Sequence, residues 1–315
     1  MEAVTVTLNP ALDLTIHVDH LQLNAVNRGQ GMQLDAGGKG VNVASCLADA
    51  GHTVAVTGFL GDANPTRFEE LCSQKDITEA FIRIPGSTRT GIKIVDHAEQ
   101  TTTDINMPGL TPPPTATSAL ISVLDGWAST CPWFVFSGSL PPGLPADTYA
   151  THIVRLRAQG RSVALDTSGA ALAEGVRAGP TIVKPNLHEL QQLIGETLAT
   201  LPEIERAART LLDYDIALVV VSMGEEGALF VDATGSWQAI PPRVVAKSSV
   251  GAGDALVAGL VASHIRALDR PSSARLATAF AAGAVTRVGP HLPDPDVLKA
   301  YAQQVDVRPL HGTRA

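Results

Sequence analysis

The sequence predicts an α/β fold in which a mostly parallel sheet carries helices on both faces. Two observations lead to this prediction. Apolar strand-like runs alternate with helical patterns over short links, and the run at 133–137 is continuously apolar. The first is typical of a parallel sheet, and the second of a strand buried on both faces. In this half, strands are expected at 133–137, 162–165, 181–184 and 217–222, and helices at about 147–158, 170–177 and 203–213.

The rest of the chain supplies further elements. Residues 4–8 alternate Val-Thr-Val-Thr-Leu and predict a strand that stops at Asn9 and Pro10. Residues 15–34 alternate between polar and apolar without a helical period, which suits a small, partly exposed sheet. The other expected elements are strands at 53–59, 80–84, 90–95 and 102–106, with 80–84 paired to 90–95, a helix beginning near 68, a helix at about 116–127, and a hairpin of 228–231 with 237–240.

Composition and charge narrow the class of protein. The chain has 315 residues and a net charge of −8, which argues against a general nucleic-acid or anionic-membrane surface. An anionic substrate would therefore need a local cationic pocket. The three cysteines, Cys46, Cys72 and Cys131, have no C-x-x-C spacing, so a disulfide framework or a zinc site is not expected. No signal peptide or apolar run of membrane-spanning length is recognisable, and a soluble cytoplasmic protein is expected.

The stretch 247–256 (KSSVGAGDAL) places two glycines and one carboxylate directly before a helical apolar pattern. Glycines allow a tight turn, and the helix that follows adds unpaired N–H groups and the positive end of its dipole. This is an anion site, and phosphate is its usual ligand. Asp254 would repel a phosphate, but its charge makes sense as a base for an incoming hydroxyl. The alternative is a helix start at which Asp254 is only a cap.

Two further stretches are candidates for ligand binding near the start of the chain. Residues 36–44 (AGGKGVNVA) run into an Ala/Leu helix, and Lys39 and Asn42 offer donors there. Their spacing matches neither G-x-G-x-x-G nor the P-loop, so tight helix packing is the alternative. Asp13 follows the first strand closely, at the edge where a parallel sheet meets its ligands. Its alternative is a turn carboxylate that caps its own backbone.

Asn186 and Glu189 are three residues apart after the strand predicted at 181–184. On a starting helix they share a face, and together they could hold a hydrated Mg²⁺ through water. The same spacing fits a capping box, with Asn186 as N-cap and Glu189 at the third helical position. Both interpretations can be true.

Taken together, these stretches resemble the ribokinase-like (phosphofructokinase B-type) sugar kinases along essentially the whole chain. The two signatures of that family correspond to residues 36–44 and 248–254, with 137–143 and the pair Asn186 and Glu189 between them. Two independent signatures in the right order make the resemblance specific.

The resemblance implies a ribokinase-like three-layer fold, with helices on both faces of a mostly parallel sheet. A single sugar-kinase domain would span residues 1–315, and a small β-sheet lid would be formed by about 13–35 and 87–107. In this family the lid often doubles as a dimer interface, so a homodimer through the lid is expected. ATP and Mg²⁺ are the implied cofactors.

The resemblance also implies roles for individual residues. Asp254 would take the proton of the sugar hydroxyl as it attacks the γ-phosphorus of ATP, and the N–H groups of Gly251, Ala252 and Gly253 would stabilise the developing charge. Lys39 and Arg89, with Arg28 and Ser139, would hold the phosphate that the sugar already carries. The residues expected to orient the sugar itself are Asp13, Gly37, Gly38, Asn42 and Asn106. The residues expected to bind the nucleotide are Lys184, Asn186, Ser222, Gly224, Gly227, Ser249, Val250, Gly251 and Gly253, and Asn186 and Glu189 are those expected to hold Mg²⁺.

Within the family, the chain is most similar to members that phosphorylate fructose 1-phosphate on its 6-hydroxyl to give fructose 1,6-bisphosphate. The features that carry this similarity are 7–10 with Asp13, 58–61, 88–89, 183–186, 248–254, 275–279 and 305–310. A tagatose-6-phosphate or fructose-6-phosphate kinase on the same scaffold is the alternative.

Two functions from other classes fit the sequence less well. One is a non-catalytic sensor of a sugar phosphate or nucleotide, but such a protein has no need of the base Asp254. The other is a dinucleotide-dependent oxidoreductase, but no strand is followed by G-x-G-x-x-G with an acidic residue about twenty positions later.

Overall fold

The computed structural model describes residues 1–99, 101–246, 251–287, 289 and 291–310. In this part of the chain a central sheet of eleven strands runs in the order β15-β14-β13-β12-β11-β10-β9-β1-β4-β5, with β6 also paired to β4. Strands β12, β11, β10, β9, β1 and β4 pair in parallel in that order, and β5 and β6 each pair in parallel with β4. The pairs β12–β13, β13–β14 and β14–β15 are antiparallel. The strands are β1 (Ala3–Thr7), β4 (Val54–Gly61), β5 (Thr78–Glu79), β6 (Ile82–Ile84), β9 (Trp133–Ser137), β10 (Ser162–Asp166), β11 (Ile182–Val183), β12 (Leu218–Ser222), β13 (Ala228–Val231), β14 (Ser236–Ile240) and β15 (Asp306–Pro309).

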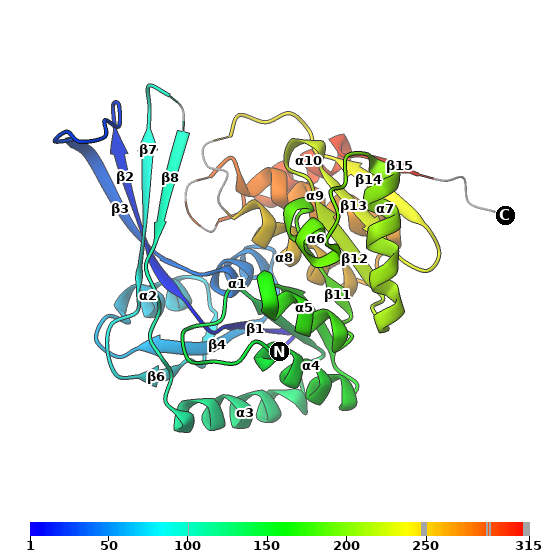
Figure 1. The fold of residues 1–315 in the computed structure, drawn as a ribbon, viewed down its shortest axis with the longest axis horizontal. Helices are drawn as coiled ribbons and strands as arrows, with labels where there is room; N and C mark the ends of the chain where they lie inside the picture. The colour runs from blue at the N-terminus through cyan, green and yellow to red at the C-terminus, as the bar shows by residue number, and fades with distance from the viewer. Residues whose placement is uncertain (100, 247–250, 288, 290, 311–315) are drawn as a thin grey trace.

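Helices cover both faces of this sheet (Figure 1). One hydrophobic cluster packs α1 (Lys39–Asp49), α2 (Thr66–Gln74), α8 (Ala252–Ile265), α9 (Arg270–Ala284) and α10 (Pro295–Gln304) on one face. A second cluster packs α3 (Pro114–Ala128), α4 (Thr148–Ala158), α5 (Gly169–Arg177), α6 (Leu187–Ile194) and α7 (Leu201–Thr210) on the other. The central strands β1, β4 and β9 are buried at every residue, as expected for strands between two helical layers. The predicted three-layer α/β fold is confirmed.

A separate four-stranded sheet stands away from this body, at the upper left of Figure 1. Its order is β3-β2-β7-β8, with β2 and β7 parallel and both outer pairs antiparallel. The strands are β2 (Ala11–Val18), β3 (Gly29–Gly37), β7 (Thr90–Asp96) and β8 (Thr101–Asn106). The small sheet expected from the sequence is thus present. Its action as a lid remains a prediction.

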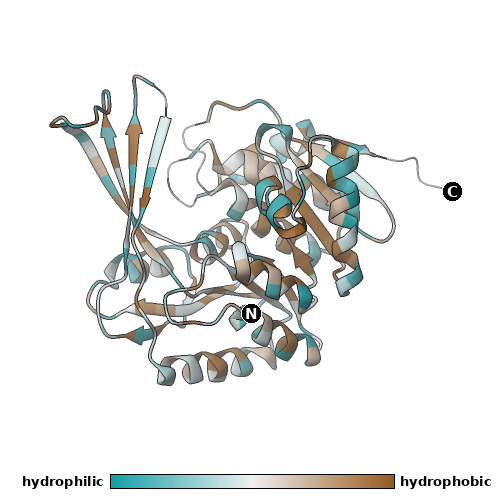
Figure 2. Cartoon of the chain, viewed as in Figure 1, coloured by the Kyte–Doolittle hydropathy of each residue, from teal (hydrophilic) through white to brown (hydrophobic). Residues whose placement is uncertain are grey.

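The two faces of the small sheet differ in polarity, and Figure 2 shows the alternation along its strands. Residues paired across strands share a face. The registers therefore place Leu14, Ile92 and Ile105 on one face and Asp13, Gly91 and Asn106 on the other. Close to the central sheet, the side chains on the apolar face of the small sheet are part of the hydrophobic core. Farther out its side chains are open to solvent, with Met32 80% and Ile105 45% exposed.

Two expectations about local structure need correction. The pairing of 80–84 with 90–95 is wrong, because β6 (Ile82–Ile84) joins β4 of the central sheet and β7 (Thr90–Asp96) joins β2 and β8. Asp13 does not lie in a turn after the first strand but inside β2, paired with Asp35 and Gly91. The hairpin expected after residue 227 is confirmed as β13 and β14. In the described ranges, no helix is long and apolar enough to cross a membrane.

Candidate active site

The site is built around the start of α8. Gly251 is the N-cap and has a φ of 87°, a left-handed conformation that glycine adopts without strain. Ala252 and Gly253 are the first helical residues, so their N–H groups have no partner within the helix. A Cβ at Gly251 would have no described atom within 4 Å. Backbone conformation rather than packing therefore requires glycine here.

Asp254 lies in the first turn of α8 and is 6% exposed. Its Oδ2 accepts a 2.7 Å hydrogen bond from Nδ2 of Asn42, on the first turn of α1. Burial and the nearby negative charge of Asp166 raise the pKa of Asp254 to about 6, while Lys39, Asn42 and Lys184 act to lower it. A carboxylate with such a pKa is ionised at neutral pH yet is more basic than a free aspartate, which suits a general base.

Asp166, the last residue of β10, is a site residue that sequence reasoning missed. It is fully buried, and its Oδ1 lies 3.2 Å from Nζ of both Lys39 and Lys184. Burial acts to raise its pKa, but the charges of Lys184 and Lys39 prevail and hold the pKa below its usual value. The available signal was its place at the carboxyl end of a predicted buried strand, the edge on which parallel sheets meet their ligands.

Lys39 opens α1 and lies between several carboxylates. Burial opposes its charge, but Asp166, Asp254 and Glu189 together raise its pKa, so it remains protonated. Its expected partner, the phosphate already on the sugar, remains a prediction. Within the chain, Lys39 Nζ contacts Asp166 Oδ1, and Lys184 Nζ contacts the same oxygen.

Asp13 and Asn106 meet at the base of the small sheet, beside glycines. A Cβ at Gly37 would lie 2.6 Å from Oδ2 of Asp13, and one at Gly91 would lie 3.0 Å from Oδ1 of Asp13 and 3.5 Å from Oδ1 of Asn106. These glycines therefore leave room for the Asp13 carboxylate. The next residue on this face of β7, Lys93, places Nζ 2.5 Å from Oδ2 of Asp13. Lys93 belongs to no recognisable sequence motif, and the sequence did not predict it as a site residue.

The loop after β1 joins Arg89 and Ser139 to the same region. The Arg89 guanidinium donates to the carbonyl oxygens of Asn9 and Met107, at 3.2 Å each. The Asn9 side chain in turn donates to Oγ of Ser139 at 3.1 Å. Arg89 Nε is buried without a hydrogen-bond partner among the described atoms. Among the described residues, Arg89 thus keeps one N–H donor without a partner, and its guanidinium lies within the electrostatic influence of Asp13.

Arg28 is not brought into this cluster. It is exposed and lies between β2 and β3, next to the pair formed by Val18 and Gly29. Gly37 and Ala11 form the opposite end of the same ladder. At about 3.4 Å per residue, the two ends are roughly 24 Å apart.

The residues expected to bind the nucleotide follow β11 and β12 at the carboxyl edge of the sheet. Asn186 forms a parallel bridge with Ser222. Gly224 and Gly227 have φ of 62° and 86°, and a Cβ at Gly227 would lie 2.0 Å from the carbonyl oxygen of Ala239. Lys184, just after β11, connects this row to α8, since its Nζ lies 3.6 Å from the place of a Cβ on Gly253. Ser249 and Val250 lie outside the described residues.

The capping box of Asn186 and Glu189 is confirmed. The Glu189 N–H donates to Asn186 Oδ1 and the Asn186 N–H donates to Glu189 Oε2, at 2.8 Å each. The second carboxylate oxygen of Glu189 is not needed for the cap. A carboxylate oxygen is the kind of donor that Mg²⁺ uses through its waters, so the expected role of Glu189 in holding the ion remains a prediction. In the described part of the chain, no group of three or more His, Cys, Asp or Glu could hold a metal ion by itself.

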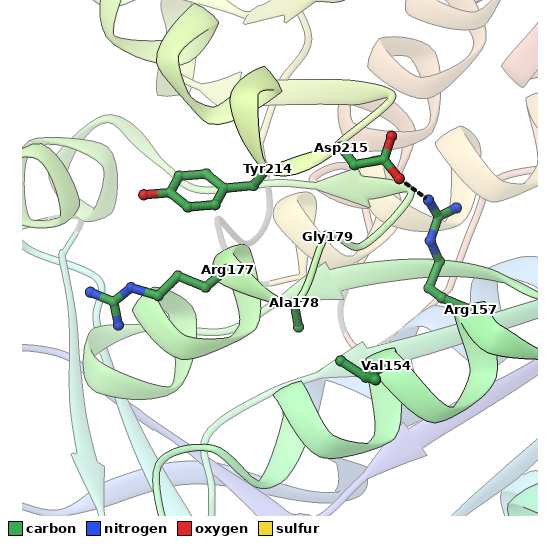
Figure 3. A pocket seen from close by; sticks show the side chains of 7 residues that line it. All are labelled: Val154, Arg157, Arg177, Ala178, Gly179, Tyr214 and Asp215. Carbon is green, nitrogen blue, oxygen red and sulfur yellow. Dashed lines mark hydrogen bonds and ion pairs between the residues drawn. The ribbon is translucent and has the colours of Figure 1, made fainter.

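A hollow of about 540 Å³ lies elsewhere on the surface (Figure 3). Its lining residues are Val154, Arg157, Arg177, Ala178, Gly179, Tyr214 and Asp215. They come from the ends of α4, α5 and the 3₁₀ turn Leu211–Tyr214, where the chain enters β10, β11 and β12. The hollow is thus at the amino ends of these strands, and the cluster around Asp254 is at their carboxyl ends.

Comparison with known proteins points in the same direction as the geometry. The family described as pfkB family carbohydrate kinase matches residues 6–297. The 1-phosphofructokinase of Rhodobacter capsulatus is 45% identical over 311 residues, 98% of each chain. That of Xanthomonas campestris pv. campestris is 47% identical over 289 residues, 89% of this chain and 90% of the relative.

Two solved structures are similar over nearly the whole chain. Phosphofructokinase-2 from Escherichia coli, in complex with substrates and products, superposes with a TM-score of 0.91 at 26% identity and covers 96% of this chain and 99% of that one. A protein from Thermotoga maritima described as a possible 1-phosphofructokinase has a TM-score of 0.90 at 28% identity, covering 99% of this chain and 100% of that one.

Proposed function

The chain belongs to the pfkB family of carbohydrate kinases, and we propose that it transfers the γ-phosphoryl group of ATP to the 6-hydroxyl of fructose 1-phosphate. The products are fructose 1,6-bisphosphate and ADP. The observation that carries this proposal is Asp254, a buried carboxylate of raised pKa in the first turn of a helix whose first N–H groups have no partner within the helix. Relatives up to 47% identical over most of the chain are 1-phosphofructokinases.

Asp254 acts as the general base. It accepts the proton of the 6-hydroxyl as that oxygen attacks the γ-phosphorus, and the bond from phosphorus to the bridging oxygen of ADP breaks. The N–H groups of Gly251, Ala252 and Gly253 stabilise the charge on the transferred group. Lys39 stays protonated beside Asp166 and, with Arg89 and Ser139, holds the phosphate that the sugar already carries.

The sugar is held between the two motifs and the small sheet. Asp13, Asn42 and Asn106 orient hydroxyl groups, and Gly37 and Gly38 let the sugar approach the backbone. Arg89 and Ser139 lie beside this group and contribute to binding the phosphate that the sugar carries. Arg89 Nε, which has no partner among the described atoms, supports this role.

The nucleotide lies along the row formed by Lys184, Asn186, Ser222, Gly224 and Gly227. Glu189 and Asn186 would hold Mg²⁺ through water, and the ion would neutralise charge on the ATP phosphates. Ser249 and Val250 complete the nucleotide site by their place directly before Gly251 in the sequence.

The small sheet acts as a lid and as the interface of a homodimer. Its exposed apolar face supports this assignment, because a second copy could cover Met32 and Ile105. The same assembly would give Arg28, at the far end of the sheet, a place at the substrate site. We place the enzyme in the cytoplasm, where it supplies fructose 1,6-bisphosphate to glycolysis.

The test is an ADP-release assay with fructose 1-phosphate, fructose 6-phosphate, tagatose 6-phosphate and ribose. We expect the highest kcat/KM with fructose 1-phosphate, and a clear preference for any of the others would refute the proposal. Ligand binding by calorimetry without turnover of any sugar would instead support a sensor.

A further inference from the structure

Lys93 is a largely buried cation that the mechanism above leaves without a role. It lies on β7, on the same face of the small sheet as Asp13, and only 17% of its side chain is exposed. Its Nζ is 2.5 Å from Oδ2 of Asp13. Removing an ammonium group from water is costly, and the cost is offset only by a well-placed anion. The local fold therefore keeps a positive charge beside the sugar site.

The contacts of Lys93 belong to the small sheet, and those of the base belong to α1 and α8. Asp254 is bonded to Asn42, and Asn42 stands on the first turn of α1, directly after the glycine loop. Gly37 in that loop borders the Asp13 carboxylate, and Lys93 contacts Asp13. Lys93 and Asp254 are therefore held by different parts of the site, with the glycine loop between them in this series of contacts.

Lys39 belongs to a different part of the site. Its Nζ is 3.2 Å from Asp166, and Lys184 of the nucleotide row contacts the same oxygen. Lys39 therefore lies beside Asp166, near the nucleotide row. The sugar phosphate expected at Lys39 and Arg89 carries nearly two negative charges, so a further cation on the small-sheet side of the site can help to hold it.

We propose that Lys93 binds the phosphate already carried by the sugar and thereby selects a phosphorylated ketohexose over an unphosphorylated one. The inference rests on the proposed function, because a 6-hydroxyl at Asp254 directs carbon 1 and its phosphate away from the base. The carboxylate of Asp13 would repel that phosphate, and an ammonium group between the two anions offsets the repulsion. The negative charge of Asp13 acts to raise the pKa of Arg89, which supplies a second cation at this end.

The test compares Lys93→Met with Lys93→Arg on fructose 1-phosphate and on unphosphorylated fructose. Loss of a charged hydrogen bond to phosphate should lower kcat/KM for fructose 1-phosphate roughly 10- to 100-fold, mainly through KM. The value for fructose should change little, and Lys93→Arg should recover part of the loss. Lys299→Met, on the exposed face of α10, is the matched control and should change neither value. Calorimetry should show unchanged ATP binding in every variant.

Two results would overturn the role of Lys93. Equal losses with both sugars would mean that Lys93 only holds Asp13 in place, and no loss with either sugar in Lys93→Met would mean that Lys93 does not contact the phosphate. Either result leaves the proposed function intact if the parent enzyme prefers fructose 1-phosphate. A parent enzyme that prefers a different sugar phosphate would instead refute the proposed function.

Discussion

Asn42 and Asp254 are 212 positions apart in the sequence, yet a 2.7 Å hydrogen bond joins their side chains. The bond connects the first turn of α1 to the first turn of α8, and so connects the two glycine-containing motifs. Because the amide of Asn42 is neutral, it orients the carboxylate without balancing its charge. The base is thus assembled by the packing of two helices, and its strength depends on what surrounds it.

Asp254→Asn should separate catalysis from any structural role of Asp254 at the start of α8, where Gly251 is the N-cap and no side chain caps the helix. The variant keeps the size of the side chain but cannot accept the proton, so kcat should fall about 10²- to 10⁴-fold while KM moves little. Steady-state kinetics and ATP binding by calorimetry measure the two effects. Asp269→Asn is the matched control, because Asp269 caps α9 by accepting from the Ser272 N–H and has no part in the site. Near-parental kcat in Asp254→Asn would show that Asp254 is not the base.

The acid limb of the pH–rate profile should report the raised pKa of Asp254. Activity should rise through pH 6 because the carboxylate must be ionised and its pKa is about 6. The hydrogen bond from Asn42 lowers this pKa, so Asn42→Leu should move the acid limb to higher pH. The measurement is kcat/KM from pH 5 to 8 for both enzymes. The titration of the sugar phosphate affects the profiles of both enzymes equally, so the difference between the two profiles reports a group of the enzyme. A shift to lower pH in Asn42→Leu would contradict the assignment.

Asp254→Asn should lower activity but raise the free energy of unfolding at alkaline pH. Its pKa is raised from the model-compound value of 3.8 to about 6 on folding. The fold therefore favours the protonated form, and this contribution is present below about pH 4 and is lost as the pH rises through 6. Asp254→Asn is neutral at every pH. It should be more stable than the parent at pH 8, by about 1–3 kcal/mol, and no more stable near pH 4.

Thermal unfolding of the two proteins at both pH values checks this sign. An Asp254→Asn protein that is less stable than its parent at pH 8 would mean that the carboxylate is paired more strongly than its surroundings suggest.

The layered fold could be predicted from the sequence because buried parallel strands leave a local signal. Strand β9 is apolar at every position from Trp133 to Phe136, and the helices between the strands repeat at helical period. Strand pairing beyond the regular alternation could not be predicted. Residues 82–84 and 90–96 are close in sequence but join different sheets, because pairing depends on which sheet edge is free.

The candidate site likewise has residues that the sequence predicts and residues that it does not. Asp254, Lys39 and Asn42 lie in glycine-containing motifs whose chemistry is local, and the structure brings all three together. Asp166 and Lys93 are single charged residues at the end and in the middle of strands. Their surroundings are set by long-range contacts, with Lys39 and Lys184 for one and with Asp13 for the other. No spacing rule in one sequence marks such residues.

Asp166→Asn should destabilise the protein and make Asp254 more acidic. The amide cannot balance two ammonium groups, and the side chain of Lys184 is only 5% exposed. Breaking such a buried pair costs about 3–5 kcal/mol, measurable by urea unfolding. Asp125→Asn, which removes the exposed partner of Arg155, is the control and should have little effect. Because the charge of Asp166 raises the pKa of Asp254, the acid limb of the folded variant should move to lower pH. An unchanged stability and pH profile would mean that Asp166 does not balance the two lysines.

The apolar face of the small sheet should control assembly. Met32 and Ile105 are exposed on that face, on the outer strands β3 and β8. Met32→Glu combined with Ile105→Glu would place charges in the proposed interface, where desolvation costs several kcal/mol per ion. Sedimentation velocity should then show a dimer for the parent and a monomer for the variant. Thr102→Glu adds a charge to the opposite face of β8 and should leave the dimer intact. A parent that sediments as a monomer, or a double variant that remains dimeric, would rule out this face as the interface.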